Sequence, residues 1–279
     1  MTLFQSMTQA TIYMAVTVFF LLFVSLRTNP LAPIGSFIQE MIRSRKYRLH
    51  FVMMCSVMFI NKIELWIEEH MPSRSDFTPF VSRLEGDFVA KLQHTLEQPW
   101  LTALSAYAYV VVFPVLIFAA IGIYTYGKQV KLVYAICYAL LLNYMIAIPF
   151  YLFFPVNEVW SFHPQVRFLM LDVFPTFETQ YRSMSGLDNC FPSLHTSISV
   201  AMALIALRSN NRFWKWFCCA AAAFIIFTIF YLGIHWLFDM CGGLLLGGFT
   251  AAMALLWSEG RTAFGVSWMP QRVRERFTK

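Results

Sequence analysis

The sequence predicts an all-α membrane protein, a polytopic helix bundle that crosses the bilayer about seven times. Of its 279 residues, 58% are hydrophobic and 13% are charged, whereas a soluble domain has about 25% charged residues. Several apolar runs approach or exceed the ~20 residues that a membrane-spanning helix needs. These runs lack the polar face that a helix of a soluble core presents to water. Most of the chain is therefore expected inside a membrane.

Seven hydrophobic runs give the expected spans, which are 11–26, 50–66, 101–125, 131–154, 192–209, 214–234 and 236–257. The second run is the weakest because Lys62 and Glu64 interrupt its end, and the fifth is short. No charged segment precedes the first run, so it reads as a retained anchor and not as a cleaved signal peptide. We divide the chain into an anchor with a basic loop (1–49), a six-helix core (50–257) and a basic tail (258–279).

The distribution of charge predicts the orientation. The connections 27–49, 126–132 and 208–215, together with the tail, hold 15 of the 21 Lys and Arg residues. The segments 67–99 and 155–191 hold five basic residues against ten acidic ones. Because basic loops stay in the cytoplasm, we expect the N-terminus outside, the C-terminus inside, and a location in the plasma membrane or an equivalent membrane.

One outer connection has a helical pattern of its own. Apolar residues recur at every fourth position over 79–97, which are Phe80, Leu84, Phe88, Leu92 and Leu96. This spacing predicts an amphipathic helix. Such a helix either lies in the outer membrane interface or packs on the bundle, and the pattern alone leaves both possibilities open.

The cysteines and glycines exclude several classes of protein. Five of the six cysteines fall in apolar segments, where the thiol packs as a small hydrophobic group, and Cys190 stands alone in a polar loop. No CxxC pair points to zinc or redox chemistry, and no glycine-rich nucleotide loop is present. We therefore expect no metal, no cofactor and no nucleic-acid partner, and the oligomeric state stays open.

Two polar motifs stand at the outer ends of hydrophobic runs: Phe191-Pro192-Ser193-Leu194-His195 and Gly233-Ile234-His235-Trp236-Leu237-Phe238-Asp239. Forty positions separate the two histidines. One helix into the membrane and one helix back use up that length at about 1.5 Å per residue. Both histidines are therefore expected on the same side of the membrane, within reach of each other.

The second motif has the spacing of a polarised histidine. Asp239 follows His235 by four residues, so both lie on one helical face. A carboxylate there accepts the Nδ1 proton and leaves Nε2 as a nucleophile or base. A structural His–Asp pair at a helix junction is the alternative reading.

The first motif predicts an anion site. Pro192 suits the first turn of a helix, and the free N–H groups of the residues that follow, beginning at Leu194, attract anions with help from the helix dipole. A phosphate there would contact these N–H groups, the Ser193 hydroxyl and the His195 imidazole. Alone, this motif is also compatible with an ordinary interfacial helix start.

Together, the motifs resemble those of the type-2 phosphatidic acid phosphatase superfamily, over about residues 50–257. Pro192, Ser193 and His195 match its second motif, and His235 and Asp239 match its third. Leu194 and the segment Thr228–His235 look most like the inositol phosphorylceramide synthase branch. The resemblance implies that His235 attacks phosphorus, Asp239 orients it, and His195 acts as acid and base without a metal ion.

The chain departs from the family pattern in its cations. The third motif usually has an arginine where Ile229 stands, and the lysine and arginine of the first motif are missing from 154–160. Arg182 in the outer loop is the first candidate for binding phosphate, since arginine binds it in bidentate fashion. Arg167, Arg83 and Lys62 are weaker candidates.

These observations leave three functions to weigh. The first is a lipid phosphate phosphatase acting at the outer membrane face, with a lipid phosphate and the bilayer as its partners. The second is phosphotransfer of a head group to a lipid hydroxyl, as in the synthase branch. The third is a non-enzymatic membrane protein or transporter, against which the complete set His195, His235 and Asp239 argues. A haloperoxidase-like vanadate site does not fit, because the usual cations are missing.

Overall fold

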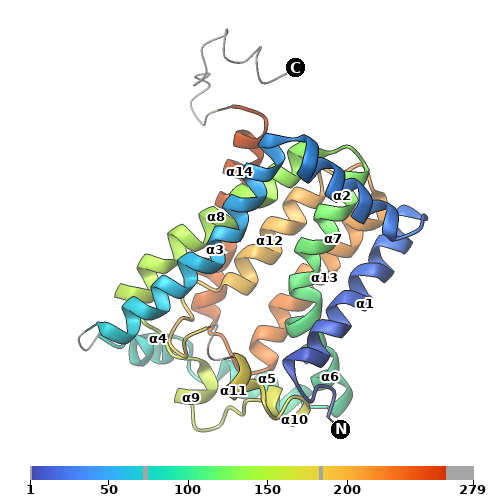
Figure 1. The fold of residues 1–279 in the computed structure, drawn as a ribbon. Coiled ribbons are helices and arrows are strands. Elements are labelled where there is room, and N and C mark those ends of the chain that lie inside the picture. The colour runs from blue at the N-terminus through green and yellow to red at the C-terminus, as the bar shows by residue number, and fades with distance from the viewer. Residues whose placement is uncertain (1, 72–74, 182–184, 262–279) are drawn as a thin grey trace.

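The structure, a computed structural model, describes residues 2–71, 75–181 and 185–261, and it confirms an all-helical membrane protein (Figure 1). Among the described residues the only β-type pairing is an isolated bridge between Val156 and Asn189. The helices are α1 (Met7–Leu26), α2 (Leu31–Arg43), α3 (Arg45–His70), α4 (Thr78–Glu85), α5 (Phe88–Leu96), α6 (Pro99–Tyr107), η1 (Ala108–Val112), α7 (Phe113–Tyr126), α8 (Val130–Phe153), α9 (Val159–Phe162), α10 (Met170–Val173), α11 (Phe177–Tyr181), α12 (Leu194–Ala206), α13 (Arg212–Tyr231) and α14 (Leu237–Ser258).

Six helical stretches in the described part of the chain are long and apolar enough to span a bilayer. They are α1, α3, the continuous run Pro99–Tyr126, α8, α13 and α14. The fifth predicted run forms α12, which has 13 residues and measures about 20 Å, against a bilayer core of about 30 Å. The expectation of seven full spans is therefore corrected to six plus one shorter apolar helix.

Helix α12 lies among other helices of the bundle. It packs against α8, α13 and α14 in the middle of the bundle (Figure 1). Glycines of α14 allow the closest approach, since a Cβ at Gly243 would lie 2.6 Å from the Ser193 carbonyl oxygen and one at Gly247 would lie 2.5 Å from that of Ser197. Small residues spaced by four let membrane helices approach in this way. The contact brings the two motif-bearing helices together.

A buried polar cluster joins the same helices below the site. The Asn143 amide on α8 donates to the Thr250 hydroxyl on α14 at 3.0 Å, and the Ser197 hydroxyl on α12 donates to the Asn143 side-chain oxygen. Side-chain hydrogen bonds between helices stabilise association in a bilayer, where no water competes for these groups. They fix the register of α8, α12 and α14.

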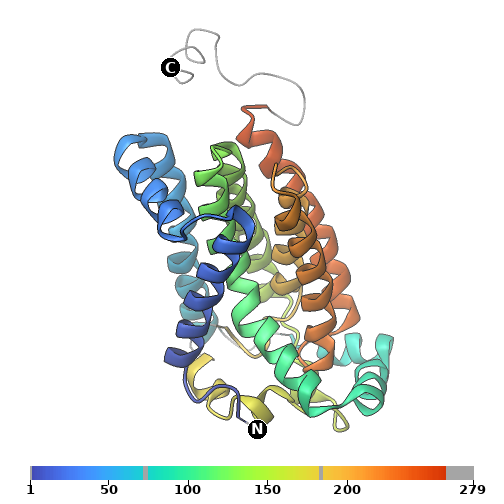
Figure 2. The same cartoon turned by 90° about the vertical axis from the view of Figure 1, so that its right-hand side faces the viewer.

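The N-terminal helices form one side of the bundle (Figure 2). α1 and α2 pack on α7, and α3 packs on α8. The basic connection, which the sequence analysis treats as a loop, contains the amphipathic helix α2, whose residues Leu31, Ile38 and Ile42 are exposed. A helix with an exposed apolar stripe beside basic residues is suited to a membrane surface.

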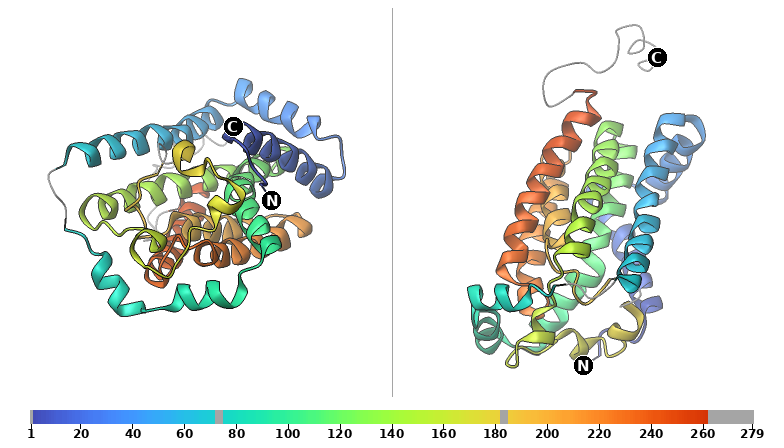
Figure 3. Two further views of the ribbon diagram at one scale, coloured as in Figure 1. Left: turned by 90° about the horizontal axis from the view of Figure 1, so that it is seen from below. Right: turned by 90° about the vertical axis from the view of Figure 1, so that its left-hand side faces the viewer.

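The segments predicted outside the membrane gather at one end of the bundle. Seen from that end, α4 and α5 follow its edge, and the chain from α9 to α11 crosses it (Figure 3). The amphipathic region 79–97 is two helices that break at Gly86, where φ is +59°. Phe80 and Leu84 on α4 are exposed, and so is Phe88 on α5, whose ring also meets Phe230 edge-on. Helix α5 nevertheless packs on the bundle through Val89, Ala90 and Gln93, and an interfacial position of α4 stays a prediction.

Candidate active site

A glycine turn between α13 and α14 presents His235. The chain leaves α13 at Tyr231, and the Ile229 carbonyl accepts the N–H groups of Ile234 at 3.0 Å and His235 at 3.1 Å. Gly233 has a φ of +82°, and a Cβ on it would lie 2.6 Å from the Arg167 carbonyl oxygen. Only glycine fits both this dihedral angle and this close approach. Ile229, at the position where the family usually has arginine, thus binds the His235 N–H through its backbone carbonyl oxygen.

His235 and Asp239 form a buried pair. His235 Nδ1 lies 3.3 Å from Asp239 Oδ2, and the same oxygen accepts the Trp236 N–H at 2.9 Å. Asp239 is fully buried and His235 is 5% exposed. A carboxylate on Nδ1 sets the tautomer that leaves the Nε2 lone pair free. The arrangement fixes the orientation of the ring and is suited to an Nε2 that acts as a nucleophile or a base.

His195 faces this pair from the start of α12. The ring centroids of His195 and His235 are 6.3 Å apart, which places both histidines at one end of the bundle, as their spacing predicts. Tyr109 stacks on His195 at 4.0 Å, and Phe113 lies 4.3 Å away. The two histidines are close enough to contact one phosphoryl group between them.

Sequence reasoning did not identify the aromatic pair that holds His195. Tyr109 belongs to η1, a π-helical segment directly before Phe113-Pro114. Pro114 has no N–H to continue the regular ladder, and π-helical segments often lie at functional sites. A proline in the middle of the third span was the available signal for this bulge.

Ser193 and Pro192 take places different from those expected. Ser193 is the N-cap of α12, fully buried, and its hydroxyl accepts the Thr196 N–H at 3.3 Å. Its own N–H donates to the Asp239 carbonyl oxygen at 3.1 Å, which links the two motifs directly. Pro192 precedes the cap and is not in the first helical turn, because Ser193 already starts the helix. Leu194 lines the pocket beside His195.

The pocket between the histidines has a polar wall. Asn61, Glu158 and Asn189 line it, together with the aromatic residues Tyr109, Phe113, Tyr144, Tyr151 and Tyr181. The Asn189 amide donates to Glu64, which is buried beneath it, at 3.1 Å. Sequence reasoning treated Glu64 only as an interruption of a span. A buried ionisable residue in a membrane helix marks a functional region.

The cations expected to bind phosphate do not line the described part of the pocket, which contains neither lysine nor arginine. Arg167 is exposed and pairs with Glu97 at 2.5 Å and with Asp172 at 3.0 Å. Arg83 and Lys62 are also exposed. Arg182 lies outside the described residues, so its expected role stays a prediction.

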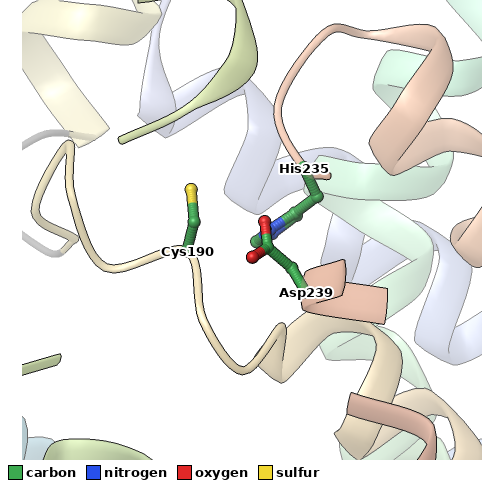
Figure 4. A group of neighbouring side chains, drawn as sticks. All are labelled: Cys190, His235 and Asp239. Atoms are coloured by element: carbon green, nitrogen blue, oxygen red, sulfur yellow. The ribbon is translucent and has the colours of Figure 1, made fainter. Parts of the chain in front are cut away.

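Cys190 lies beside the histidine pair, and not alone in a polar loop as the sequence analysis has it. It is buried, its thiol lies 3.7 Å from the Ile234 carbonyl oxygen, and one donor atom from each of Cys190, His235 and Asp239 lies within 4.8 Å of the others (Figure 4). Thiolate, imidazole and carboxylate are a ligand set that zinc accepts. A metal bound through Nδ1 would, however, replace the hydrogen bond between His235 and Asp239.

Comparison with known proteins agrees with this geometry. The model of the PAP2 superfamily matches residues 78–253. The chain matches no curated protein and no solved structure at a significant level. The matched region begins at α4 and ends within α14, so it contains both motifs and leaves α1, α2 and α3 outside. Since this region is more than half of the chain, the protein belongs to the PAP2 superfamily.

Proposed function

We propose that the protein is an integral-membrane lipid phosphate phosphatase that acts through a phosphohistidine at His235. The observation that carries this proposal is the buried His235–Asp239 pair, whose ring lies 6.3 Å from that of His195 across a pocket. A nucleophile, a group that orients it and an acid–base partner are the parts that covalent catalysis needs. Membership of the PAP2 superfamily agrees with a phosphatase-type activity.

The reaction has two displacements at phosphorus. In the first, His235 Nε2 attacks, the ester P–O bond breaks, and His195 protonates the leaving oxygen. In the second, neutral His195 takes a proton from water, the resulting hydroxide attacks phosphorus, and the P–N bond breaks. Asp239 holds the Nδ1 proton of His235 and stabilises the positive charge on its ring. We infer that Arg182 binds the phosphate oxygens, together with N–H groups at the start of α12 near Leu194.

An apolar wall beside the motifs supports a lipid substrate. Phe191 stacks on Phe238 at 4.7 Å and meets Phe150 edge-on at 5.4 Å. Phe150 and Phe153 are exposed on the neighbouring helix α8. Acyl chains can lie against these rings while the phosphate reaches the histidines.

Phosphotransfer is the alternative, and the polar wall of the pocket favours it. Asn61, Glu158 and Asn189 place amide and carboxylate groups on one wall of the pocket. A hydroxyl-bearing acceptor would use them, as the resemblance to the inositol phosphorylceramide synthase branch implies. Water in the second displacement would then be replaced by an alcohol.

One experiment separates the two reactions. Purified protein in mixed vesicles is given a ³²P-labelled lipid phosphate, with and without added inositol or a diacylglycerol acceptor. Hydrolysis releases inorganic phosphate without any acceptor, which is the expected result. Label that appears only with an acceptor, as inositol phosphate when inositol is added or as a new lipid phosphate when diacylglycerol is added, supports transfer. Absence of both products with a range of lipid phosphates would contradict the proposal.

The active site is proposed to face the non-cytoplasmic side. A cysteine in place of Asp172, at the site end of the bundle, is expected to react with an impermeant thiol reagent applied outside intact cells. A cysteine in place of Asn210, at the opposite end, is expected to react only after the membrane is opened. The native cysteines are replaced in both cases. The reverse pattern would place the site in the cytoplasm.

A further inference from the structure

An acidic residue far from both motifs contacts the helix that carries Asp239. Glu85 is the last residue of α4 and is half-buried. Its carboxylate accepts the N–H of Leu237 at 2.7 Å and the N–H of Phe238 at 2.5 Å. These are the first two residues of α14. Glu85 therefore caps this helix from a different part of the chain.

The donors at the start of α14 are divided between two carboxylates. The first N–H groups of a helix have no partner within it. Here Asp239 Oδ2 accepts the N–H of Trp236, and Glu85 accepts the next two. Asp239 Oδ2 also lies against His235 Nδ1. Because Glu85 accepts the other donors, Asp239 can hold the position that contacts the histidine.

The place of Glu85 in its own helix supports this reading. A negative side chain at a helix C-terminus is unfavourable, whereas one at a helix N-terminus is favourable. Glu85 stands at the C-terminus of α4 and at the N-terminus of α14. Burial raises the pKa of Glu85 above its ordinary value, and the two backbone hydrogen bonds act in the opposite direction. The contact with α14 thus explains an otherwise unfavourable position.

We propose that Glu85 is a positioning residue for the proposed reaction, and that its cap on α14 keeps Asp239 bonded to His235. Asp239 is the third residue of α14, within reach of the helix donors that Glu85 satisfies. Without Glu85, the Asp239 carboxylate turns toward the unpaired N–H groups and leaves the Nδ1 of His235. The inference rests on the function proposed above, and it assigns to α4 a role in holding the nucleophile.

Kinetics of three variants test this role. Glu85→Ala removes both acceptors, and Glu85→Gln keeps the shape with one acceptor oxygen. Glu97→Gln is the control, because Glu97 is an exposed carboxylate that pairs with Arg167 at the same end of the protein. We expect kcat to fall about 100-fold in Glu85→Ala and about 10-fold in Glu85→Gln, since small misplacements of reacting groups have effects of this size. KM in both Glu85 variants is expected to stay within twofold of the wild-type value. For the Glu97→Gln control, both kcat and KM are expected to stay within twofold of the wild type.

A spectroscopic measurement tests the same role without using activity. In ¹⁵N-histidine-labelled protein, the hydrogen-bonded Nδ1–H of His235 is assigned by its absence in His235→Gln. We expect this signal in the wild type and in Glu97→Gln, and its loss in Glu85→Ala. An unchanged signal and unchanged kcat in folded Glu85→Ala would overturn the inference. If the wild type is inactive but the signal still depends on Glu85, the proposed function fails and the positioning role stands.

Discussion

The two histidines of the site are held in different ways. His235 is fixed by hydrogen bonds, with Asp239 on its ring and the Ile229 carbonyl on its backbone N–H. The His195 ring lies against the faces of Tyr109 and Phe113, and no hydrogen bond to that ring is found among the described residues. One ring is oriented by a charge, whereas the other is oriented by stacking.

This difference matches the different tasks that we propose for the two residues. A nucleophile gains from one fixed tautomer, which a carboxylate on Nδ1 provides. An acid–base group has to gain and lose a proton during each cycle, and a permanent charged partner would favour one protonation state. Stacking restrains the ring plane of His195 without a hydrogen bond from a described residue to either ring nitrogen. We therefore expect substitutions around His235 and substitutions around His195 to impair different steps of the reaction.

The largest effects are expected from the three residues that we propose to be catalytic. His235→Ala, Asp239→Asn and His195→Ala are each expected to lower turnover by about 10²–10⁴-fold, the range typical of acid–base groups. A substrate with a good leaving group, such as p-nitrophenyl phosphate, separates the roles. His195→Ala should still accumulate a phosphohistidine with it, and His235→Ala should form none. Phosphoenzyme in His235→Ala would contradict the assignment.

The next largest effect is expected where α14 packs against α12, the contact that brings the two motifs together. Gly247→Ala places a methyl group against the Ser197 carbonyl oxygen, and Gly248→Ala places one where no atom lies within 4 Å. Overpacking typically costs 1–3 kcal/mol, so only Gly247→Ala is expected to lower thermal stability in detergent, with a loss of activity. Equal behaviour of the two variants would show that α12 and α14 do not pack as described.

A smaller effect is expected on the stacked side. Tyr109→Ala removes the ring that stacks on His195, and Tyr109→Phe keeps it. Since an aromatic pair contributes about 0.5–1.5 kcal/mol, we expect Tyr109→Ala to lower kcat by up to about tenfold and Tyr109→Phe by less than twofold. If Tyr109→Phe were as slow as Tyr109→Ala, the hydroxyl and not the ring would be the important group.

The smallest effect is expected at Cys190. If His235 and Asp239 act as a hydrogen-bonded pair, EDTA and Cys190→Ser leave the rate within twofold, and vanadate inhibits as a mimic of five-coordinate phosphorus. If the three residues instead hold a required metal, EDTA abolishes activity and zinc restores it. Steady-state rates with and without chelator distinguish these outcomes.

Local sequence patterns were enough to predict much of the fold. Apolar length alone located the helices α1, α3, α8, α13 and α14 to within a few residues, because a helix in a bilayer has to satisfy its own backbone hydrogen bonds. For α12 the predicted run 192–209 was longer than the helix itself, which has 13 residues. The length of an apolar run does not show what surrounds the helix. The glycines of α14 allow a close approach only because α12 lies opposite them in the fold.

The candidate site also has one part that the sequence predicts and another that only the fold determines. The spacing of His195, His235 and Asp239 determined that they would meet, because one helix in and one helix back use up forty residues. Their surroundings come from segments outside the two motifs: Tyr109 from a π-helical bulge, Glu85 from the end of α4, and Cys190 from a loop. Sequence spacing determines contacts within a helix or across one hairpin. The remaining contacts join residues more than forty positions apart, and only the packing of the whole bundle decides which of them meet.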